Sequence, residues 1–338
     1  MKCTPILVIF CLLLISGCKT KEVECAFQPE TSAIKVDLVF NALEDSVLAI
    51  KTKQQLVNFF SRHKVMRDVF FNRPGYPNDS VFINELFQRF TNPSFDTLLL
   101  ETKRVFNDGA ELKKEFAAAF TNLKYYYPEI RLPRIETVIT GLESDLFVSD
   151  TLIIVGLDYY LGAGAKYRPN MYEYMLKRYT KEFVVPSAML LYGIDSRINF
   201  VDQKDKSVLA DMIAYGKAYY FAKQMLPCVA DSVFLGYTSD EIAGAIENQD
   251  LIWKRLVQDE VFFNSTQQVK QKYISERPKT YEVGDQCPGR IGMWVGWQIV
   301  GSFIKNNPVK KSPKISLPAL MKLTDAQQIF KESKYRPK

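Results

Sequence analysis

The sequence predicts a predominantly helical α+β fold, with one globular domain built around a small β-sheet. Apolar residues recur at helical spacing through most of the first third of the chain and again from Tyr172 onward. Between these regions, residues 134–140 and 146–160 are rich in β-branched side chains and are separated by turn residues. The chain contains no internal repeat and no linker long enough to require a second domain.

The first eighteen residues resemble a bacterial lipoprotein signal. Lys2 gives a basic start, and residues 6–15 form an apolar run that is too short for a permanent membrane span. A Ser-Gly pair precedes Cys18, whose thiol is what lipid attachment requires. We therefore expect residues 1–17 to be a removed signal peptide and Cys18 to be the acylated first residue. A plain secretory signal and a buried core helix are the alternatives.

The remaining elements follow from local patterns in chain order. Residues 18–33 are polar and aperiodic, which predicts a tether, and residues 34–338 are expected to form the globular domain. Residues 34–40 alternate apolar and polar side chains, as a strand does. Spacing and capping residues predict helices over 42–64, 79–90, 95–106, 110–126, 171–183, 186–192, 207–226, 238–258, 288–305 and 325–334. The two β-branched segments predict a hairpin or two neighbouring strands.

Composition and charge are those of an ordinary folded protein. Charged residues make up 24% of the chain and hydrophobic ones 47%, and the net charge is +6. The sequence contains no dense basic stretch with interleaved aromatic residues, which argues against nucleic acid as a partner.

Cysteine and histidine content limits the possible chemistry. Cys25, Cys228 and Cys287 remain as thiols after processing, and a Cys228–Cys287 disulfide is weakly favoured because Cys25 lies in the tether; three free thiols are equally compatible. The single histidine, His63, is expected on the surface at the basic end of a helix. A zinc site with two histidines therefore cannot form.

Two segments are candidates for binding. Residues 156–164 follow a strand but lack a dinucleotide-binding pattern, and a tight turn there would carry Asp158, Tyr159 and Tyr160 toward a cleft or an interface. Residues 287–298 hold three glycines near one helix face, where dense packing is the default interpretation. The functional interpretation is a partner groove formed by Asp158, Tyr159, Tyr160, Arg290, Trp294 and Trp297. No catalytic centre, cofactor site or metal site can be assembled from the acidic residues.

Three separated motifs closely resemble the gliding motility lipoprotein GldB family of Bacteroidetes. They are Leu-Ile-Ile-Val-Gly-Leu-Asp-Tyr-Tyr-Leu-Gly at 152–162, Pro-Gly-Arg-Ile-Gly-Met-Trp-Val-Gly-Trp-Gln-Ile-Val at 288–300 and Lys-Glu-Ser-Lys-Tyr-Arg-Pro-Lys at 331–338. The resemblance covers essentially the whole mature chain. It implies a component of the gliding or associated secretion machinery with a lipid anchor, without an established enzymatic reaction.

More distantly, the layout resembles zincin-type metallopeptidases. That resemblance would place zinc ligands near 184–192 and a glutamate near Tyr215, where this chain has no such ligands. This resemblance implies that the protein is a pseudoenzyme, a scaffold that has lost its metal.

The first functional hypothesis is a non-enzymatic protein that contacts membrane lipid through Cys18 and other envelope or gliding-machinery proteins through its body. Because Lys19 follows the cysteine, the periplasmic face of the outer membrane is the favoured location. The second hypothesis is a zincin-like envelope hydrolase or peptidoglycan-active enzyme.

Overall fold

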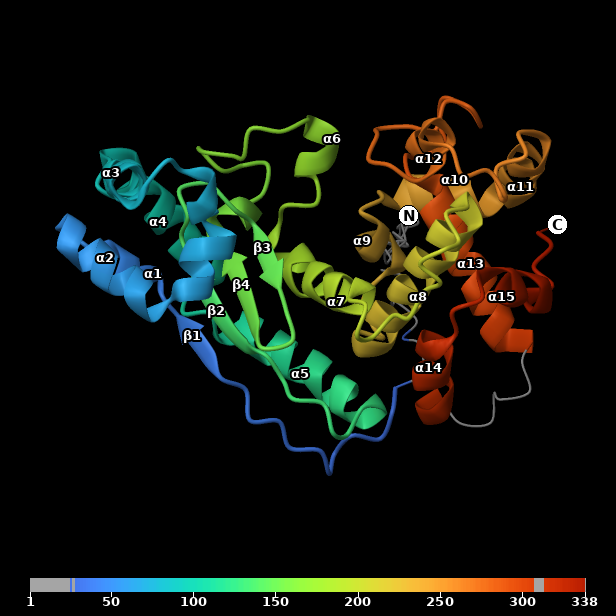
Figure 1. Ribbon diagram of the computed structural model, residues 1–338, viewed down its shortest axis with the longest axis horizontal. Helices are drawn as coiled ribbons and strands as arrows, with labels where there is room; N and C mark the ends of the chain where they lie inside the picture. Colours follow the sequence, from blue (N-terminus) through green and yellow to red (C-terminus); the bar gives the residue numbers. More distant parts are fainter. Residues whose placement is uncertain (1–24, 26–27, 307–312, 338) are drawn as a thin grey trace, which may run out of the picture.

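The computed structural model of the protein describes Cys25, residues 28–306 and residues 313–337. Helices dominate this part of the chain and its strands form one small sheet, so the predicted predominantly helical α+β class is confirmed (Figure 1). The expected signal peptide and the expected lipid attachment site, Cys18, lie outside the described residues.

The sheet has four short strands in the order β1-β2-β4-β3. Its strands are β1 (Phe40–Ala42), β2 (Arg134–Val138), β3 (Leu146–Val148) and β4 (Leu152–Gly156). β1, β2 and β4 run parallel, whereas β3 folds back antiparallel onto β4. Of the two predicted alternatives, the neighbouring strands are confirmed, since β2 and β4 pair in parallel, and a hairpin between the two segments is wrong; the hairpin that forms, β3 with β4, lies within the second segment. The strand predicted over 34–40 begins only at Phe40.

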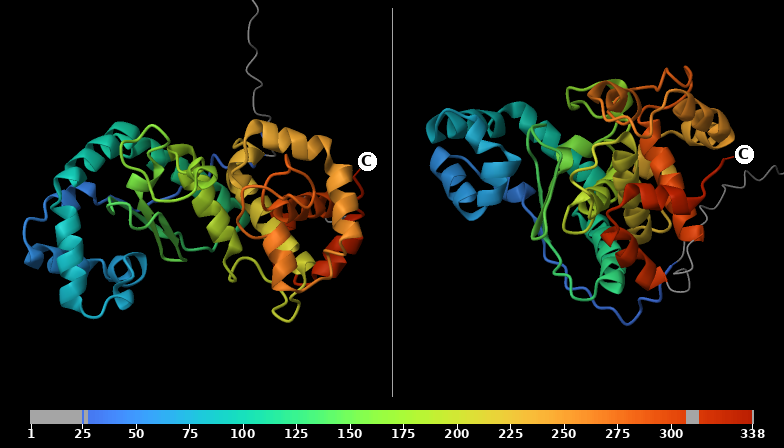
Figure 2. Two further views of the ribbon diagram at one scale, coloured as in Figure 1. Left: turned by 90° about the horizontal axis from the view of Figure 1, so that it is seen from above. Right: turned by 45° about the vertical axis from the view of Figure 1, so that its right-hand side comes forward.

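The two faces of the sheet are covered by two different hydrophobic clusters. Ile153 and Val155 of β4 belong to one cluster, and Leu152 and Ile154 belong to the other, because successive side chains of a strand point to opposite faces. Helices α1 (Glu44–Leu48), α2 (Lys53–Arg62), α3 (Asp79–Phe90) and α4 (Pro93–Phe106) cover the second face. Figures 1 and 2 show these helices on one side of the sheet and the helices from Val184 onward on the other.

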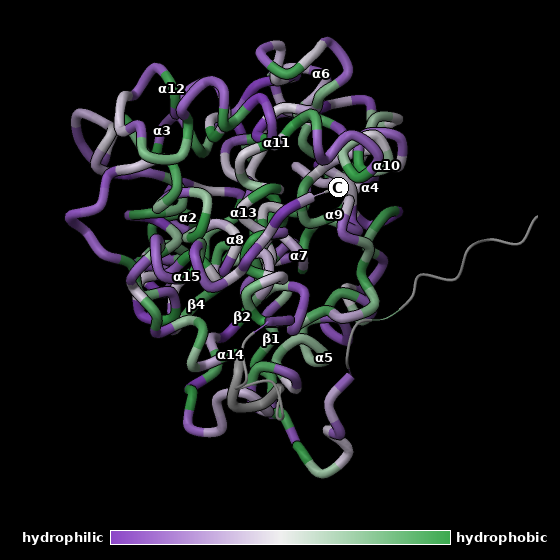
Figure 3. Tube along the Cα trace, turned by 90° about the vertical axis from the view of Figure 1, so that its right-hand side faces the viewer, coloured by the Kyte–Doolittle hydropathy of each residue, from purple (hydrophilic) through white to green (hydrophobic). Residues whose placement is uncertain are grey.

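Helix α8 (Val208–Met225) is the centre of the larger cluster. It packs against α7 (Val184–Ile194), α13 (Ile291–Asn306), α15 (Ala326–Ser333) and α5 (Ala110–Tyr126). In Figure 3, α8 and α13 lie in the middle of the molecule, and hydrophilic segments run around the outside. Among the residues that the structure describes, no helix is both long enough and apolar enough to cross a membrane.

Several helices differ from the predicted elements. Predicted helix 238–258 is divided at Asn248 into α10 (Ser239–Glu247) and α11 (Gln249–Gln258). Predicted helix 171–183 shrinks to α6 (Glu173–Leu176) and a 3₁₀ turn, Lys181–Phe183. Helices without a prediction are α9 (Asp231–Leu235), α12 (Gln267–Tyr273), α14 (Pro313–Lys322) and the π-helix Met66–Phe70.

Candidate functional site

Asp158, Tyr159 and Tyr160 lie in a 3₁₀ turn directly after β4, as the sequence predicts. The Asp158 carboxylate is fully buried and accepts hydrogen bonds from the backbone N–H groups of Thr140 and Leu142, at 2.9 and 2.6 Å. Burial raises the pKa of Asp158, and these donors oppose that rise. The carboxylate thus holds the loop after β2 against the turn after β4, which is a structural role.

Arg290, Trp294 and Trp297 lie at the start of α13 and inside the core. Arg290 adopts a left-handed conformation (φ 58°) and donates to the carbonyl oxygen of Leu235 at 2.6 Å. Trp294 is 1% exposed, and Trp297 is 7% exposed and stacks on Tyr219 at 5.3 Å between ring centroids. The tryptophans therefore present almost no surface to a partner.

The two groups of residues are linked through one short segment, Arg178 and Tyr179. The ring of Tyr179 contacts the rings of both Tyr159 and Tyr160, at centroid distances of 5.6 and 5.4 Å. The neighbouring Arg178 forms an ion pair with Glu276, and Glu276 lies 3.7 Å from Arg290. Only a hollow of about 10 Å³ adjoins Asp158 and Tyr159. These contacts connect Asp158, Tyr159 and Tyr160 with Arg290 inside the molecule, and the partner groove stays a prediction.

A cleft of about 750 Å³ opens elsewhere, between the C-terminal ends of α5 and α7 and the helix α14. Its lining comes from four separate segments: residues 126–131, the β3–β4 turn at Asp150 and Thr151, residues within 192–200, and Pro318 with Lys322. Such a volume suits a side chain cluster or a small molecule. None of these segments carries a sequence motif, so no local pattern of the sequence indicates the cleft.

The floor of the cleft is aromatic. Tyr126 is 3% exposed and donates its hydroxyl to Gln224 Oε1 at 2.8 Å. The neighbouring Tyr127 hydroxyl is buried and has no hydrogen-bond partner in the structure. Burial raises the pKa of Tyr192 to about 12, so its phenol stays protonated at neutral pH. The floor therefore offers apolar rings and one unused hydroxyl.

The rim of the cleft is charged. Some of its charged side chains form ion pairs with each other, and others do not. Arg197 pairs with both Asp195 and Asp150, and these hydrogen bonds raise the pKa of the guanidinium and lower the pKa of Asp195. Arg131 and Lys322 form no ion pair with any residue that the structure describes. Glu129 also lines the cleft and forms no ion pair with a described residue, so the three cations of the lining are matched by three carboxylates.

His63 differs from its prediction. Its Nδ1 atom lies 3.3 Å from Glu136 Oε2, its side chain is 17% exposed, and its ring packs on Phe59. His63 ends α2 beside Arg62, as predicted, but its side chain is only partly exposed, because it makes a long-range contact with β2 that could not be read from the local sequence. Within the described part of the chain, no group of three or more His, Cys, Asp or Glu side chains could hold a metal ion.

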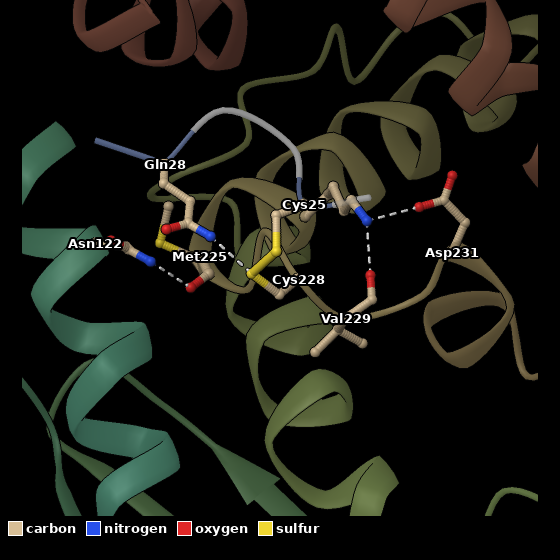
Figure 4. The surroundings of a disulfide bond; sticks show 8 residues. Cys25, Gln28, Asn122, Met225, Cys228, Val229 and Asp231 are labelled. Atoms are coloured by element: carbon tan, nitrogen blue, oxygen red, sulfur yellow. Dashed lines mark hydrogen bonds and ion pairs between the residues drawn. A yellow bond between two sulfur atoms is a disulfide. The ribbon is translucent and has the colours of Figure 1, made fainter. Parts of the chain in front are cut away.

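The disulfide also differs from its prediction. Cys25 pairs with Cys228, and Cys287 is the free thiol, so the weakly favoured Cys228–Cys287 pair is wrong (Figure 4). Burial raises the pKa of Cys287 to about 12, which keeps this thiol protonated and unreactive. The segment that was expected to be a free tether is therefore bonded to the loop after α8.

Comparison with known proteins gives one match. A family model described as "Gliding motility protein GldB", whose label marks lipoproteins, matches residues 24–337. No curated protein and no solved structure matches the chain.

Proposed function

This chain belongs to the family of the gliding motility protein GldB, and we propose that it serves the gliding machinery as a non-enzymatic, lipid-anchored envelope protein that acts by protein contacts. The family match supports involvement in gliding motility. The cleft between α5, α7 and α14 is the observation that carries the proposed mode of action.

The chemistry of the cleft favours a segment of a partner protein. Phe200 is 44% exposed and lines the cleft, so its ring is available to an occupant. An apolar centre surrounded by charged residues is the usual anatomy of a protein interface. The proposed occupant is an apolar side chain flanked by charged groups: the apolar part would contact Phe200 and Ile130, and the flanking charges would pair with Glu129 and with Arg131 and Lys322.

The cleft is tested by charge substitution in a gliding host. Phe200→Glu places a carboxylate in the apolar centre, and we expect loss of colony spreading at a normal protein level. Val69→Glu is the matched control, since Val69 is 53% exposed on the other side of the sheet and should tolerate the same change. Full spreading of the Phe200→Glu strain would refute the role of the cleft, and normal spreading after deletion of the gene would refute the gliding function itself.

Lipid attachment at Cys18, on the periplasmic face of the outer membrane, is the second part of the proposal. The Ser-Gly-Cys sequence at the end of the apolar run supports it. Labelling cells with a clickable palmitate should mark the wild-type protein and leave Cys18→Ala unlabelled and in the soluble fraction. A Cys18→Ala protein that still sediments with the outer membrane would contradict the anchor.

A further inference from the structure

The bond between Cys25 and Cys228 joins the N-terminal segment to a well-held loop of the body. Cys228 lies in the loop between α8 and α9, and the Cα atoms of the two cysteines are 4.2 Å apart. Asn122 of α5 donates to the carbonyl oxygen of Met225 at 2.9 Å, just before this loop. Lys223 donates to the carbonyl oxygen of Val229 at 2.6 Å and pairs with Asp231 at 3.0 Å (Figure 4). The disulfide is therefore fixed to a loop that is bonded on both sides.

Beyond Cys25 the chain runs a long way before it joins the sheet. Gln28 donates to Cys228 Sγ at 2.9 Å, and the next regular element is β1, which begins at Phe40. Figure 1 shows the connecting segment passing along the lower edge of the molecule, from the side of α8 and α14 to β1 on the opposite side. Between Gln28 and β1 the buried side chains are Pro29 and Leu38, so without the disulfide the chain would be held firmly only at Leu38 and β1, on that opposite side.

Chain length decides what this difference means for an anchored protein. Cys25 lies seven positions after Cys18 (25 − 18), and Phe40 lies 22 positions after it (40 − 18). Fully extended, these stretches reach roughly 25 Å and roughly 75 Å. A domain of this size has a radius of gyration of about 20 Å and is thus roughly 50 Å across. The segment from Cys18 to Phe40 is long enough to let any face of the domain meet the bilayer. The segment from Cys18 to Cys25 is too short for that.

We propose that the Cys25–Cys228 disulfide sets which surface of the protein faces lipid. The surface around the α8–α9 loop and α9 lies toward the bilayer, and α1, α2 and α3 lie away from it. This inference rests on the proposed lipid anchor at Cys18. Its consequence is that an oxidised envelope presents the sheet side of the molecule outward, at a defined height above the membrane.

Energy transfer to labelled lipid tests the orientation in the full-length, lipidated protein. A donor dye is attached through a clickable amino acid at Ser232 in α9 or at Lys53 at the start of α2, on opposite sides of the molecule (Figure 2). The vesicles are of phosphatidylethanolamine and phosphatidylglycerol with an acceptor-labelled lipid. We expect transfer from Ser232 to exceed that from Lys53 several-fold.

Breaking the disulfide should remove that difference. Cys228→Ser, and in parallel Cys25→Ser, should bring the two transfer efficiencies close together while the protein stays on the vesicles. Cys25 is exposed and outside any helix or strand, so its substitution leaves the fold in place. Cys287→Ser is the matched control and should keep the wild-type ratio, because Cys287 is the free thiol.

The outcomes separate the inference from the anchor on which it rests. Equal transfer from Ser232 and Lys53 in the disulfide-bonded protein would overturn the inference, as would an unchanged ratio in both serine variants. Cys18→Ala should abolish transfer from both positions. If Cys18→Ala still binds the vesicles with wild-type transfer, the proposed lipid anchor is refuted. The orientation inference is then refuted as well, because the chain would not be attached to lipid at Cys18.

Discussion

Lys217 is a lysine of α8 that is buried at 1% exposure and bound by backbone carbonyl groups. Its Nζ atom donates to the carbonyl oxygens of Phe200 and Leu323, at 2.6 and 2.7 Å. None of the described carboxylates lies within ion-pair distance of it. Burial lowers the pKa of Lys217 to about 8. The side chain therefore joins α8 to the segment that carries Phe200 and to the end of α14, at an electrostatic cost near neutral pH.

The electrostatic cost of burying Lys217 should make the free energy of unfolding depend on pH. Because the pKa of Lys217 is about 8 in the folded protein and near 10.5 when unfolded, the unfolded chain binds more protons between these values. Stability contributed by Lys217 should therefore rise from pH 8 to pH 10.5, by up to about 3 kcal/mol. Urea unfolding of wild type and Lys217→Met across this range checks it, since other titrating groups cancel in the difference. A difference that does not change with pH would contradict it.

At the scale of residues, the sequence predicted the local position of a residue better than the distant residues that it contacts. The turn position of Asp158 was predicted, because a Gly follows a β-branched run there, but its bonds to Thr140 and Leu142 were not. The pairing of Cys25 was missed because it joins residues 203 positions apart. The burial of Lys217 could not be predicted from the sequence, since a single lysine in a helical pattern looks like an ordinary exposed residue.

At the scale of elements, the crossing of α8 and α13 depends on two glycines. A Cβ atom on Gly296 would lie 1.9 Å from the carbonyl oxygen of Met212, and one on Gly216 would lie 2.4 Å from the carbonyl oxygen of Gly296. The two backbones are therefore in direct contact. The sequence interpretation of dense packing around the glycines of residues 287–298 is confirmed, and the approaching backbone belongs to this chain itself.

The same helix offers a matched pair of substitutions. Gly296→Ala must push α13 away from α8, and we expect the free energy of unfolding to fall by about 3 kcal/mol or more. Gly301→Ala, in the same helix, meets no atom within 4 Å and should raise it by roughly 0.5–1 kcal/mol, because alanine favours the helix. Chemical unfolding followed by circular dichroism checks both. Equal effects of the two changes would show that the close contact is unimportant.

Elements with both a capping side chain and an apolar stripe were predicted well. Helix α3 has the predicted bounds and is capped by Asn78, and Thr238 forms the predicted capping box at the start of α10. Helix α5 also has the predicted bounds, although no side chain caps its start. The prediction over 171–183 was too long, because its aromatic and charged residues occur at helical spacing but mostly contact other segments. Short helices such as α9 were missed since five residues are too few to show a period.

At the scale of the whole molecule, the sheet separates two hydrophobic clusters, and the cleft lies where distant segments meet. The two clusters could be predicted in part from the sequence, because β4 is a continuous apolar run that must be buried on both faces. The cleft was not, since α5, α7 and α14 come together only through the tertiary packing. The disulfide adds a third long-range feature that no local pattern could reveal.

Buried tyrosines give the whole molecule a limit at high pH. Burial raises the pKa of Tyr159, Tyr192 and Tyr335 to about 12, above the ordinary value of 10. Since an unfolded chain would release these protons near pH 10, the stability present below pH 10 is lost as the pH rises toward 12. We therefore expect a cooperative alkaline transition in which phenolate absorbance at 295 nm rises as helical circular dichroism falls.

Single substitutions can assign part of that transition. Tyr192→Phe removes one ionisable phenol and should move the alkaline midpoint upward, because up to about 2.7 kcal/mol of pH-dependent destabilisation disappears. Tyr172→Phe is the control, since Tyr172 is 74% exposed and should leave the midpoint in place. If phenolate absorbance rises while the circular dichroism is still native, the rings ionise in the folded state. The tyrosines that line the cleft and support the turn after β4 would then be open to solvent, contrary to the packing described above.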